Sequence, residues 1–365
     1  MLYPVMPIYL KSIGFSVAFI GLLEGLAEAT AGLSKGYFGK WSDQSGRRLP
    51  FVQLGYLLSA ISKPLLALSA LPAWVFTARS FDRLGKGIRT GARDAMLSDE
   101  ATPTTKATVF GFHRATDTLG AVMGPLMALL YLHYYPGDYQ NLFYLAFFPG
   151  MLAILLTFFL KDKIIPAKKQ TASFGFFSAY KYLKEGGSNY RKLVIGLLFF
   201  ALINSSDIFL LLQARQSGLD DRSIIAVYIF YNLIYALSAF PSGILADRLG
   251  IKKLFTLGTL LFALVYLSIP YCQGSAHFLL LFAIYGIYAA MTEGISKAWI
   301  SNISPATETA TAIGVYSGLQ SICALLASTL AGLLWVSYGA AATFLISGIS
   351  ALILVLYFAI VVREG

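Results

Sequence analysis

Long apolar runs separated by short polar stretches dominate the pattern of this chain. Most of them approach the roughly 20 residues that a helix needs to cross the hydrocarbon core of a bilayer. The eleven runs cover residues 16–38, 50–70, 73–90, 107–133, 140–160, 193–213, 223–246, 254–272, 276–297, 310–336 and 340–362. The pattern therefore predicts an all-α membrane protein, because a helix satisfies its own backbone hydrogen bonds in lipid.

One further apolar segment is too short to span a bilayer. Residues 1–10, MLYPVMPIYL, precede the first full run. We interpret this segment as the second half of an additional helix, so we expect the first helix of the bundle to be truncated.

The composition agrees with a lipid environment. The chain is 57% hydrophobic and 13% charged, about half the roughly 25% charged residues of a soluble domain. The net charge of +10 reflects basic residues that gather in alternate loops. They are Lys40, Arg47, Arg48, Arg248, Lys252, Lys253 and the eight Lys and Arg residues of segment 161–192. By the positive-inside rule, these loops and the C-terminus face the cytoplasm of an inner (cytoplasmic) membrane, and we expect no nucleic-acid partner.

Two stretches of the chain repeat each other. The motif Gly-x-x-x-Asp-x-x-Gly begins at Gly39 and again at Gly243, an offset of 204 (243 − 39). Internal repeats of this kind are common in secondary transporters. We therefore predict an N-terminal bundle over residues 1–160, a basic linker over 161–192 and a C-terminal bundle over 193–365.

The first copy of the motif, which continues into Arg47 and Arg48, resembles the signature loop of the major facilitator superfamily. The resemblance covers the whole chain and implies two pseudo-symmetric six-helix bundles that transport by alternating access. A narrower resemblance is to a bacterial permease branch that includes nickel- and cobalt-resistance exporters. It rests on Glu24-Gly-Leu-Ala-Glu28, Asp82-Arg-Leu-Gly-Lys-Gly-Ile-Arg89, Arg93-Asp94-Ala, Gly111-Phe-His-Arg114, Asn204-Ser-Ser-Asp207 and Thr292-Glu293-Gly.

Ionisable residues inside the predicted spans are the main candidates for a transport site. Each costs at least ~2.5–3.5 kcal/mol to insert into hydrocarbon, so it faces the bundle interior or a water-filled cavity. Glu24 and Glu28 lie four residues apart on one helix face, where two carboxylates disfavour joint ionisation. Such a pair suits proton coupling or cation binding, and structural pairing with basic residues is the competing interpretation.

The run 73–90, with the residues that follow it, is the most charged. We expect Arg79 and Asp82, deep in this span, either to contact substrate or to form a structural pair. Nearer the predicted cytoplasmic end we expect a gate of paired charges. Its predicted members are Asp43, Arg47, Arg48, Lys86, Arg89, Arg93, Asp94, Arg114 and Asp247.

The run 107–133 adds a titratable pair and a packing motif. His113 and Asp117 lie four residues apart and can hydrogen-bond along a helix, and histidine titrates near neutral pH. Gly120, Gly124 and Pro125 form a segment that permits close helix contact. This segment partly resembles the fifth-helix motif of proton-coupled antiporters.

In the second half of the chain, Asp207 lies well inside a predicted span, next to Asn204. We expect both to bind substrate or protons, with a polar helix–helix contact as the alternative. Asn232 and Glu293 are supporting candidates, although Glu293 could pair with Lys297 four residues away.

No pattern in the chain indicates an enzyme or a cofactor. The phosphate-loop motif Gly-x-x-x-x-Gly-Lys-Ser/Thr is not matched, and the two cysteines and three histidines form no metal-enzyme motif. We therefore expect no catalytic residue and no cofactor, and we leave a metal site undetermined.

The leading hypothesis is a secondary active transporter, a proton-coupled exporter of a small cationic or amphipathic substrate. Its expected partners are a small molecule or ion, protons and the lipid bilayer, and we expect a monomer. The acids suit a divalent metal, whereas the many aromatic residues suit an amphipathic organic molecule, and both stay open. The alternatives are a facilitator or importer, or a non-transporting sensor or scaffold with the same fold.

Overall fold

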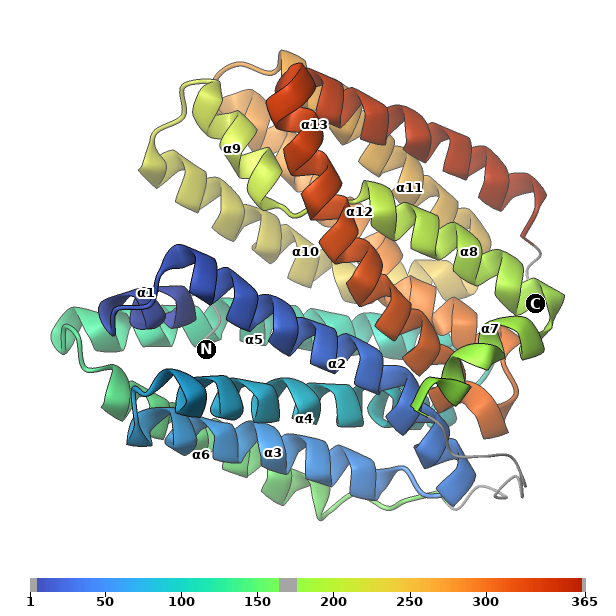
Figure 1. Cartoon of the computed structure of the whole chain (residues 1–365). Helices are drawn as coiled ribbons and strands as arrows, with labels where there is room; N and C mark the ends of the chain where they lie inside the picture. Colours follow the sequence, from blue (N-terminus) through green and yellow to red (C-terminus); the bar gives the residue numbers. More distant parts are fainter. Residues whose placement is uncertain (1–4, 164–175, 363–365) are drawn as a thin grey trace. The chain divides into compact units, whose positions relative to one another are not determined.

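The structure is a computed structural model that describes residues 5–163 and 176–362. In these ranges every regular element is helical, which confirms the all-α prediction. The elements are α1 (Val5–Ser12), α2 (Val17–Ser45), α3 (Leu49–Leu68), α4 (Pro72–Asp99), α5 (Lys106–Tyr134), α6 (Tyr139–Thr157), η1 (Phe176–Lys181), α7 (Tyr182–Glu185), α8 (Gly187–Ile203), α9 (Ile208–Gln216), α10 (Asp221–Leu249), α11 (Ile251–Ser268), η2 (Ile269–Tyr271), α12 (Ser275–Ile303), η3 (Ala306–Glu308) and α13 (Thr309–Ile360) (Figure 1).

The predicted apolar runs correspond to these helices. Eight helical segments of the described chain are long and apolar enough to cross a membrane. One of them, α13, contains the run 310–336 and all but the last two residues of the run 340–362, and it changes direction between them at Gly339, where φ is 85°. Helices α2 and α4 are as long as most of the other spans but carry more charged residues. A criterion of apolarity alone therefore does not identify them as membrane spans. Helix α1 has only eight residues and is too short to span a bilayer.

One predicted span is interrupted. The run 193–213 predicts a continuous helix, but α8 and α9 are separated by Asn204-Ser-Ser-Asp207. Asn, Ser and Asp favour such a break because their side chains compete with the backbone for hydrogen bonds. The backbone N–H of Ser206 finds an acceptor in Ser328 Oγ at 3.3 Å. The break therefore places polar groups in the middle of the apolar run.

The helices group into two compact units. Unit 1 consists of residues 1–99, 120–182 and 305–321, and unit 2 consists of residues 100–119, 183–304 and 322–365. Each unit thus contains a segment from the other half of the sequence, the start of α13 in unit 1 and the start of α5 in unit 2. The sequence-based boundaries 1–160, 161–192 and 193–365 stay a prediction.

In unit 1, α4 packs against both α2 and α3, and α3 also packs against α6 (Figure 1). An apolar cluster surrounds α1 and includes Met6, Leu10 and Leu66. The ring of Tyr9 meets the ring of Phe143 edge-on, with centroids 4.8 Å apart. Helix α1 is therefore packed into the apolar core of this unit.

In unit 2, α12 packs against α10 and α11 and is the most buried of the candidate spans. Aromatic rings fill much of this core. Phe255 lies 5.8 Å from Trp299, and Tyr285 lies 5.0 Å from both Tyr231 and Tyr288, measured between ring centroids. A tyrosine-rich core brings hydroxyl groups into an otherwise apolar interior.

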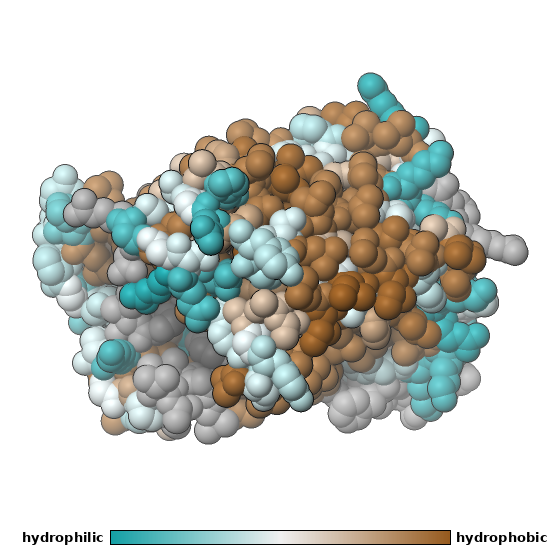
Figure 2. All heavy atoms as spheres, turned by 90° about the horizontal axis from the view of Figure 1, so that it is seen from above, coloured by the Kyte–Doolittle hydropathy of each residue, from teal (hydrophilic) through white to brown (hydrophobic). Residues whose placement is uncertain are grey.

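The surface carries a broad hydrophobic area. Figure 2 shows one face on which this area is continuous and hydrophilic residues gather on either side of it. Large apolar side chains are exposed on most of the spans, among them Leu155, Leu237 and Leu356. Soluble monomers rarely expose apolar patches beyond several hundred Å², so this surface suits contact with lipid.

Candidate functional site

The two copies of the repeated motif make the same contact. In unit 1, Asp43 at the end of α2 accepts hydrogen bonds from the backbone N–H groups of residues 310 and 311, at 3.3 and 2.7 Å. In unit 2, Asp247 at the end of α10 accepts them from residues 107 and 108, at 3.0 and 2.7 Å. Each acid therefore caps the first turn of a helix, α13 or α5, where unpaired N–H groups and the helix dipole favour negative charge.

The motif glycines are required because two backbones meet at each contact. A Cβ at Gly39 would overlap the carbonyl group of Ala310, and a Cβ at Gly243 would overlap that of Ala107. A side chain at either position would force the helices apart. The repeat in the sequence thus encodes two close helix approaches, α2 with α13 in unit 1 and α10 with α5 in unit 2.

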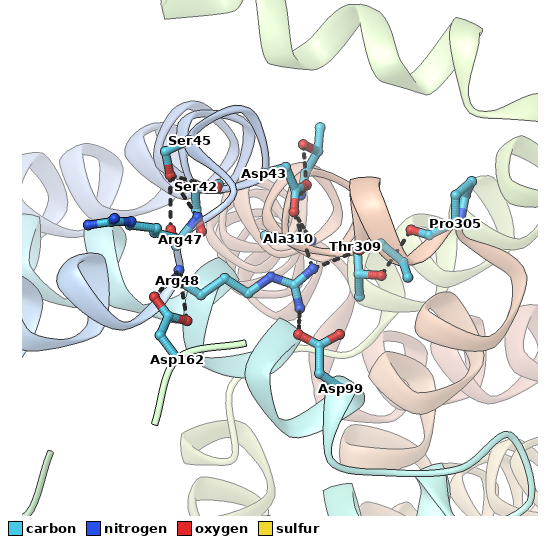
Figure 3. A network of polar contacts seen from close by, with 12 residues as sticks. Ser42, Asp43, Ser45, Arg47, Arg48, Asp99, Asp162, Pro305, Thr309 and Ala310 are labelled. Carbon is cyan, nitrogen blue, oxygen red and sulfur yellow. Dashed lines mark hydrogen bonds and ion pairs between the residues drawn. The ribbon is translucent and has the colours of Figure 1, made fainter. Parts of the chain in front are cut away.

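The contact of Asp43 belongs to a larger polar network (Figure 3). The side chain of Arg48 is 2% exposed, and its guanidinium lies 3.5 Å from Asp43. The same group hydrogen-bonds to Asp99 and, at 2.7 Å, to the carbonyl of Ala306. The carboxylate of Asp162 accepts the backbone N–H of Arg48 at 3.1 Å. We call Asp43, Arg48, Asp99, Asp162 and the first turn of α13 the Asp43 network.

The network settles which of two adjacent arginines turns inward. Arg47 is exposed, whereas Arg48 is buried and reaches Asp43. The chain turns at Gly46, where φ is 66°, and this turn sets the directions of the two side chains that follow. Both arginines were predicted at the gate, and the sequence alone could not rank them.

The other predicted gate residues on α4 contact different partners. Arg93 binds its neighbour Asp94 at 2.7 Å. Arg89 donates to Ser59 Oγ at 2.7 Å and lies over the ring of Tyr56, 4.5 Å from its centroid. We predicted Asp43 beside these residues, and the contacts that the structure shows for Asp43 are with Arg48 and the start of α13.

Two more side chains hold α2 to its neighbours in unit 1, one to α13 and one to η1, and sequence reasoning missed both. Lys35 donates to Ser317 O at 3.4 Å and to Ser321 Oγ at 2.7 Å. Tyr180, on η1, donates to Leu33 O at 3.1 Å, and burial raises the pKa of Tyr180 to about 12, so its hydroxyl stays a donor at neutral pH. Lys35 could have been found as a cation inside an apolar run. Tyr180 gave no local signal.

A cavity of about 530 Å³ lies between α3, α4 and α6 of unit 1. It is lined by cations and one acid, namely Lys63, Arg79, Arg83, Lys86, Arg89 and Asp82. We call it the unit-1 cavity. The predicted pair of Arg79 and Asp82 is present at 3.6 Å, but Lys63 lies closer to the same carboxylate, at 2.6 Å. Lys63 was missed, although it is a cation within a predicted span.

Glu28 of α2 contacts two of the cavity cations. Its carboxylate lies 3.0 Å from Arg83 and 3.6 Å from Lys86. These contacts match the structural pairing that competed with a coupling role for Glu28. The side chain of Glu24 lies outside the described part of the structure.

In unit 2, titratable side chains from α5, α10, α12 and the α8–α9 break meet among tyrosines. Arg114 hydrogen-bonds to Glu293 and to Tyr235, and Tyr235 donates to Glu293 at 2.8 Å. Asp207 accepts a hydrogen bond from the hydroxyl of Tyr285 at 2.7 Å and interacts electrostatically with Glu293 and Arg114. We call Arg114, Asp117, Asp207, Tyr235, Tyr285 and Glu293 the unit-2 cluster.

This cluster changes the expected partners of three residues. Arg114, predicted at the gate, binds Glu293 instead of a gate residue, and Glu293 has Arg114 and Tyr235 as its partners. Asp117, predicted to pair with His113, lies 3.3 Å from Arg114. The sequence offered each acid a partner on its own helix, whereas the fold supplies Glu293 with partners from two other helices.

The remaining predicted residues lie at or near these groups. Asn204 donates to the hydroxyl of Tyr288 at 2.8 Å, and Asn232 donates to Tyr228 O one turn back on α10 at 2.9 Å. A Cβ at Gly120 meets no described atom within 4 Å. The close helix contact predicted for the segment of Gly120, Gly124 and Pro125 is therefore not made at Gly120 in this structure.

Comparison with known families decides what kind of protein carries these charges. The model of the Major Facilitator Superfamily matches residues 1–220 and 193–365. The chain belongs to the major facilitator superfamily. It is therefore a multi-pass membrane protein of a transporter family, with a small-molecule substrate and a lipid bilayer around it, and the predicted fold is confirmed.

Individual relatives agree with this assignment. An uncharacterized MFS-type transporter of Methanocaldococcus jannaschii is 36% identical over 344 residues, covering 92% of this chain and 84% of the relative. A cis,cis-muconate transport protein of Acinetobacter baylyi is 23% identical over 293 residues, covering 76% of this chain and 70% of the relative.

Solved structures show the same fold. The fucose:proton symporter of E. coli matches with a TM-score of 0.78 at 12% identity, over 98% of this chain and 93% of that chain. The human organic anion transporter MFSD10 matches with a TM-score of 0.73 at 18% identity, over 96% of this chain and 88% of that chain. At these identities the likeness concerns the fold alone.

Proposed function

We propose that this chain is a proton-coupled secondary active transporter that works by alternating access. The unit-2 cluster is the observation that supports this most directly. Asp207 lies at the break in one apolar run and Glu293 lies within the long helix α12, and both interact with one cation, Arg114. Carboxylates at this depth raise the cost of insertion, and a sensor or scaffold with the same fold has no need of them.

The break between α8 and α9 supports a binding role for the same cluster. In transporters, discontinuous helices present polar side chains and unpaired backbone groups to substrates and coupling ions. Asp207 sits at this break and accepts a hydrogen bond from Tyr285. Protonation of an acid weakens its attraction to Arg114 and changes its role in the hydrogen bonds with tyrosine. The proton can then favour one conformation over another.

The Asp43 network and the Asp247 contact are the proposed gate. Each fastens the first turn of one helix, α13 or α5, to the end of another. Opening requires these hydrogen bonds to break, so their strength contributes to the balance between conformations. From the basic loops we place this end of the helices, and the C-terminus, on the cytoplasmic side of an inner membrane.

We propose a small amphipathic organic molecule as the substrate and export as the direction. Among the described residues, no group of three or more His, Cys, Asp or Glu side chains could hold a metal ion, which favours an organic substrate over a divalent metal. The relative named as a cis,cis-muconate transport protein supports the same choice. The sequence resemblance to a branch that includes resistance exporters supports the proposed direction.

Proton movement in vesicles tests this proposal. Purified protein is reconstituted with a pH-sensitive dye inside, and benzoate, succinate, cis,cis-muconate, tetraphenylphosphonium or Ni²⁺ is added outside. We expect at least one organic compound to move protons. Asp207→Asn and Glu293→Gln should abolish this movement, whereas Glu185→Gln, at an exposed acid on α7, should preserve it. Full proton movement in both cluster variants contradicts the proposal.

A further inference from the structure

The unit-1 cavity has an excess of positive charge. In the described part of the structure five cations line it, and two carboxylates, Asp82 and Glu28, contact them. Counting Glu24, one turn from Glu28 on α2, raises the acids to three and still leaves the cations in excess. An excess of one sign of charge is costly among helices that cross a bilayer, so this cavity favours a negatively charged occupant.

The cavity also has an apolar wall. Small residues from α3 and α6, namely Ala60, Ala146, Gly150 and Ala153, line it opposite the charges of α4. A Cβ at Gly150 would lie 3.1 Å from the Cβ of Ala60, so larger side chains there would fill the space. The volume of about 530 Å³ falls within the range of about 300–1,000 Å³ for small-molecule sites.

From this arrangement we propose that the unit-1 cavity binds an organic anion through its carboxylate group, and that this anion is the transported substrate. The proposal rests on the proposed transport function and names its substrate class. The carboxylate lies toward the cations of α4 and its hydrocarbon part lies along the small residues of α3 and α6. A cation is disfavoured by the same charges.

Lys86 is the cation best placed to receive the ligand. Its side chain is 43% exposed, and its ammonium group lies 3.6 Å from Glu28, longer than the usual 2.7–3.2 Å of a hydrogen bond. Arg79 is buried deeper, with one guanidinium nitrogen 3.6 Å from Asp82. An ammonium group has three N–H donors in a compact, rotatable arrangement, more than one long contact with a carboxylate occupies. Lys86, the more exposed of the two, can therefore donate to a further carboxylate.

Equilibrium binding without any ion gradient tests the proposal. Purified protein in phosphatidylcholine nanodiscs is titrated with radiolabelled cis,cis-muconate and benzoate, with succinate and tetraphenylphosphonium as competitors. We expect at least one carboxylate to bind and tetraphenylphosphonium not to displace it. Lys86→Gln should weaken binding about tenfold or more, since a hydrogen bond to a charged group is lost. Lys86→Arg should restore most of the affinity, and Lys11→Gln, at an exposed lysine of α1, should bind as the unchanged protein does.

Three outcomes overturn the proposal. The first is the absence of carboxylate binding, and the second is equal affinity in Lys86→Gln and the unchanged protein. The third is displacement of the bound carboxylate when phosphatidylglycerol is included in the nanodisc, which would identify the cavity as a lipid-headgroup site. Gel filtration of Lys86→Gln separates weak binding from misfolding. Because no gradient is present, carboxylate binding without proton movement refutes the coupling and preserves this inference. Proton movement driven only by tetraphenylphosphonium refutes this inference and preserves the coupling.

Discussion

The unit-1 cavity and the unit-2 cluster have opposite charge balances. Five cations and two contacting acids meet in the described part of unit 1. In the cluster, Arg114 contacts the acids Asp117 and Glu293 and interacts electrostatically with a third, Asp207. The immediate neighbours differ as well, because small residues of α3 and α6 line the cavity whereas tyrosines of α10 and α12 hydrogen-bond to the cluster.

The repeated contacts outside these two groups are nearly the same. Asp43 and Asp247 each cap the start of a helix with two backbone hydrogen bonds, and Gly39 and Gly243 each permit a close backbone approach. The two halves have therefore kept the residues that bring helices together and have diverged in the ionisable residues inside the spans. In the proposed function, one half recognises an anion and the other responds to protons.

The largest effect is expected when each unit loses a central cation. Arg114→Gln deprives Glu293 and Asp117 of the same partner, so proton-driven turnover should fall at least about tenfold with little change in KM. Lys86→Gln should instead raise KM and leave turnover largely intact. Initial rates over a range of substrate concentrations in proteoliposomes measure both constants. An identical change in the two variants would remove the functional distinction between the units.

The two capping acids should differ in their contribution to stability. Asp43→Asn weakens a helix cap and also the hold on the buried Arg48, so it should cost about 2–3 kcal/mol. This is less than the about 3–5 kcal/mol for a buried pair that loses its partner entirely, because Asp99 still binds Arg48. Asp247→Asn should cost about 0.5–2 kcal/mol as a lost cap.

Thermal unfolding in detergent checks this difference with a thiol-reactive fluorophore. Cys272 and Cys323 are both partly buried, so unfolding increases their reaction with the dye. Equal decreases in melting temperature for the two variants would mean that Arg48 adds nothing to the unit-1 contact.

The motif glycines should respond alike in the two units. Gly39→Ala and Gly243→Ala each bring a Cβ against a backbone carbonyl, and overpacking of this kind costs about 1–3 kcal/mol. Gly120→Ala is the matched control, because a Cβ there meets no described atom within 4 Å. It should be neutral or should stabilise α5 by up to about 1 kcal/mol. The same fluorophore assay measures all three, and a neutral result at Gly39 would contradict the close approach.

The smallest effect concerns Tyr180 of unit 1. Tyr180→Phe keeps the ring and removes the hydrogen bond to Leu33 O, so it should cost about 0.5–1.5 kcal/mol. Tyr271→Phe, at an exposed tyrosine of η2, should leave the melting temperature unchanged. If the two variants have the same melting temperature, the hydroxyl of Tyr180 does not stabilise the position of α2.

The sequence by itself determined the all-α fold, the positions of the spans and the repeated motif. Spans follow from local hydropathy, and the change of direction at Gly339 falls in the gap between two predicted runs. The repeat can be recognised in the sequence because Gly39 and Gly243 both lie where a second backbone leaves no room for a Cβ. The interruption at Asn204-Ser-Ser-Asp207 was missed, although its residue types favour it, because the surrounding run is strongly apolar.

Only the tertiary structure decided which charges meet. Arg48 is buried in place of Arg47, Lys63 joins Asp82, and Arg114 reaches Glu293 across 179 residues of sequence. Hydropathy and helical periodicity describe one helix at a time, whereas ion pairs form between helices at distances that packing alone sets. Candidate acids could therefore be found from their insertion cost, but their partners depend on how the helices pack against one another.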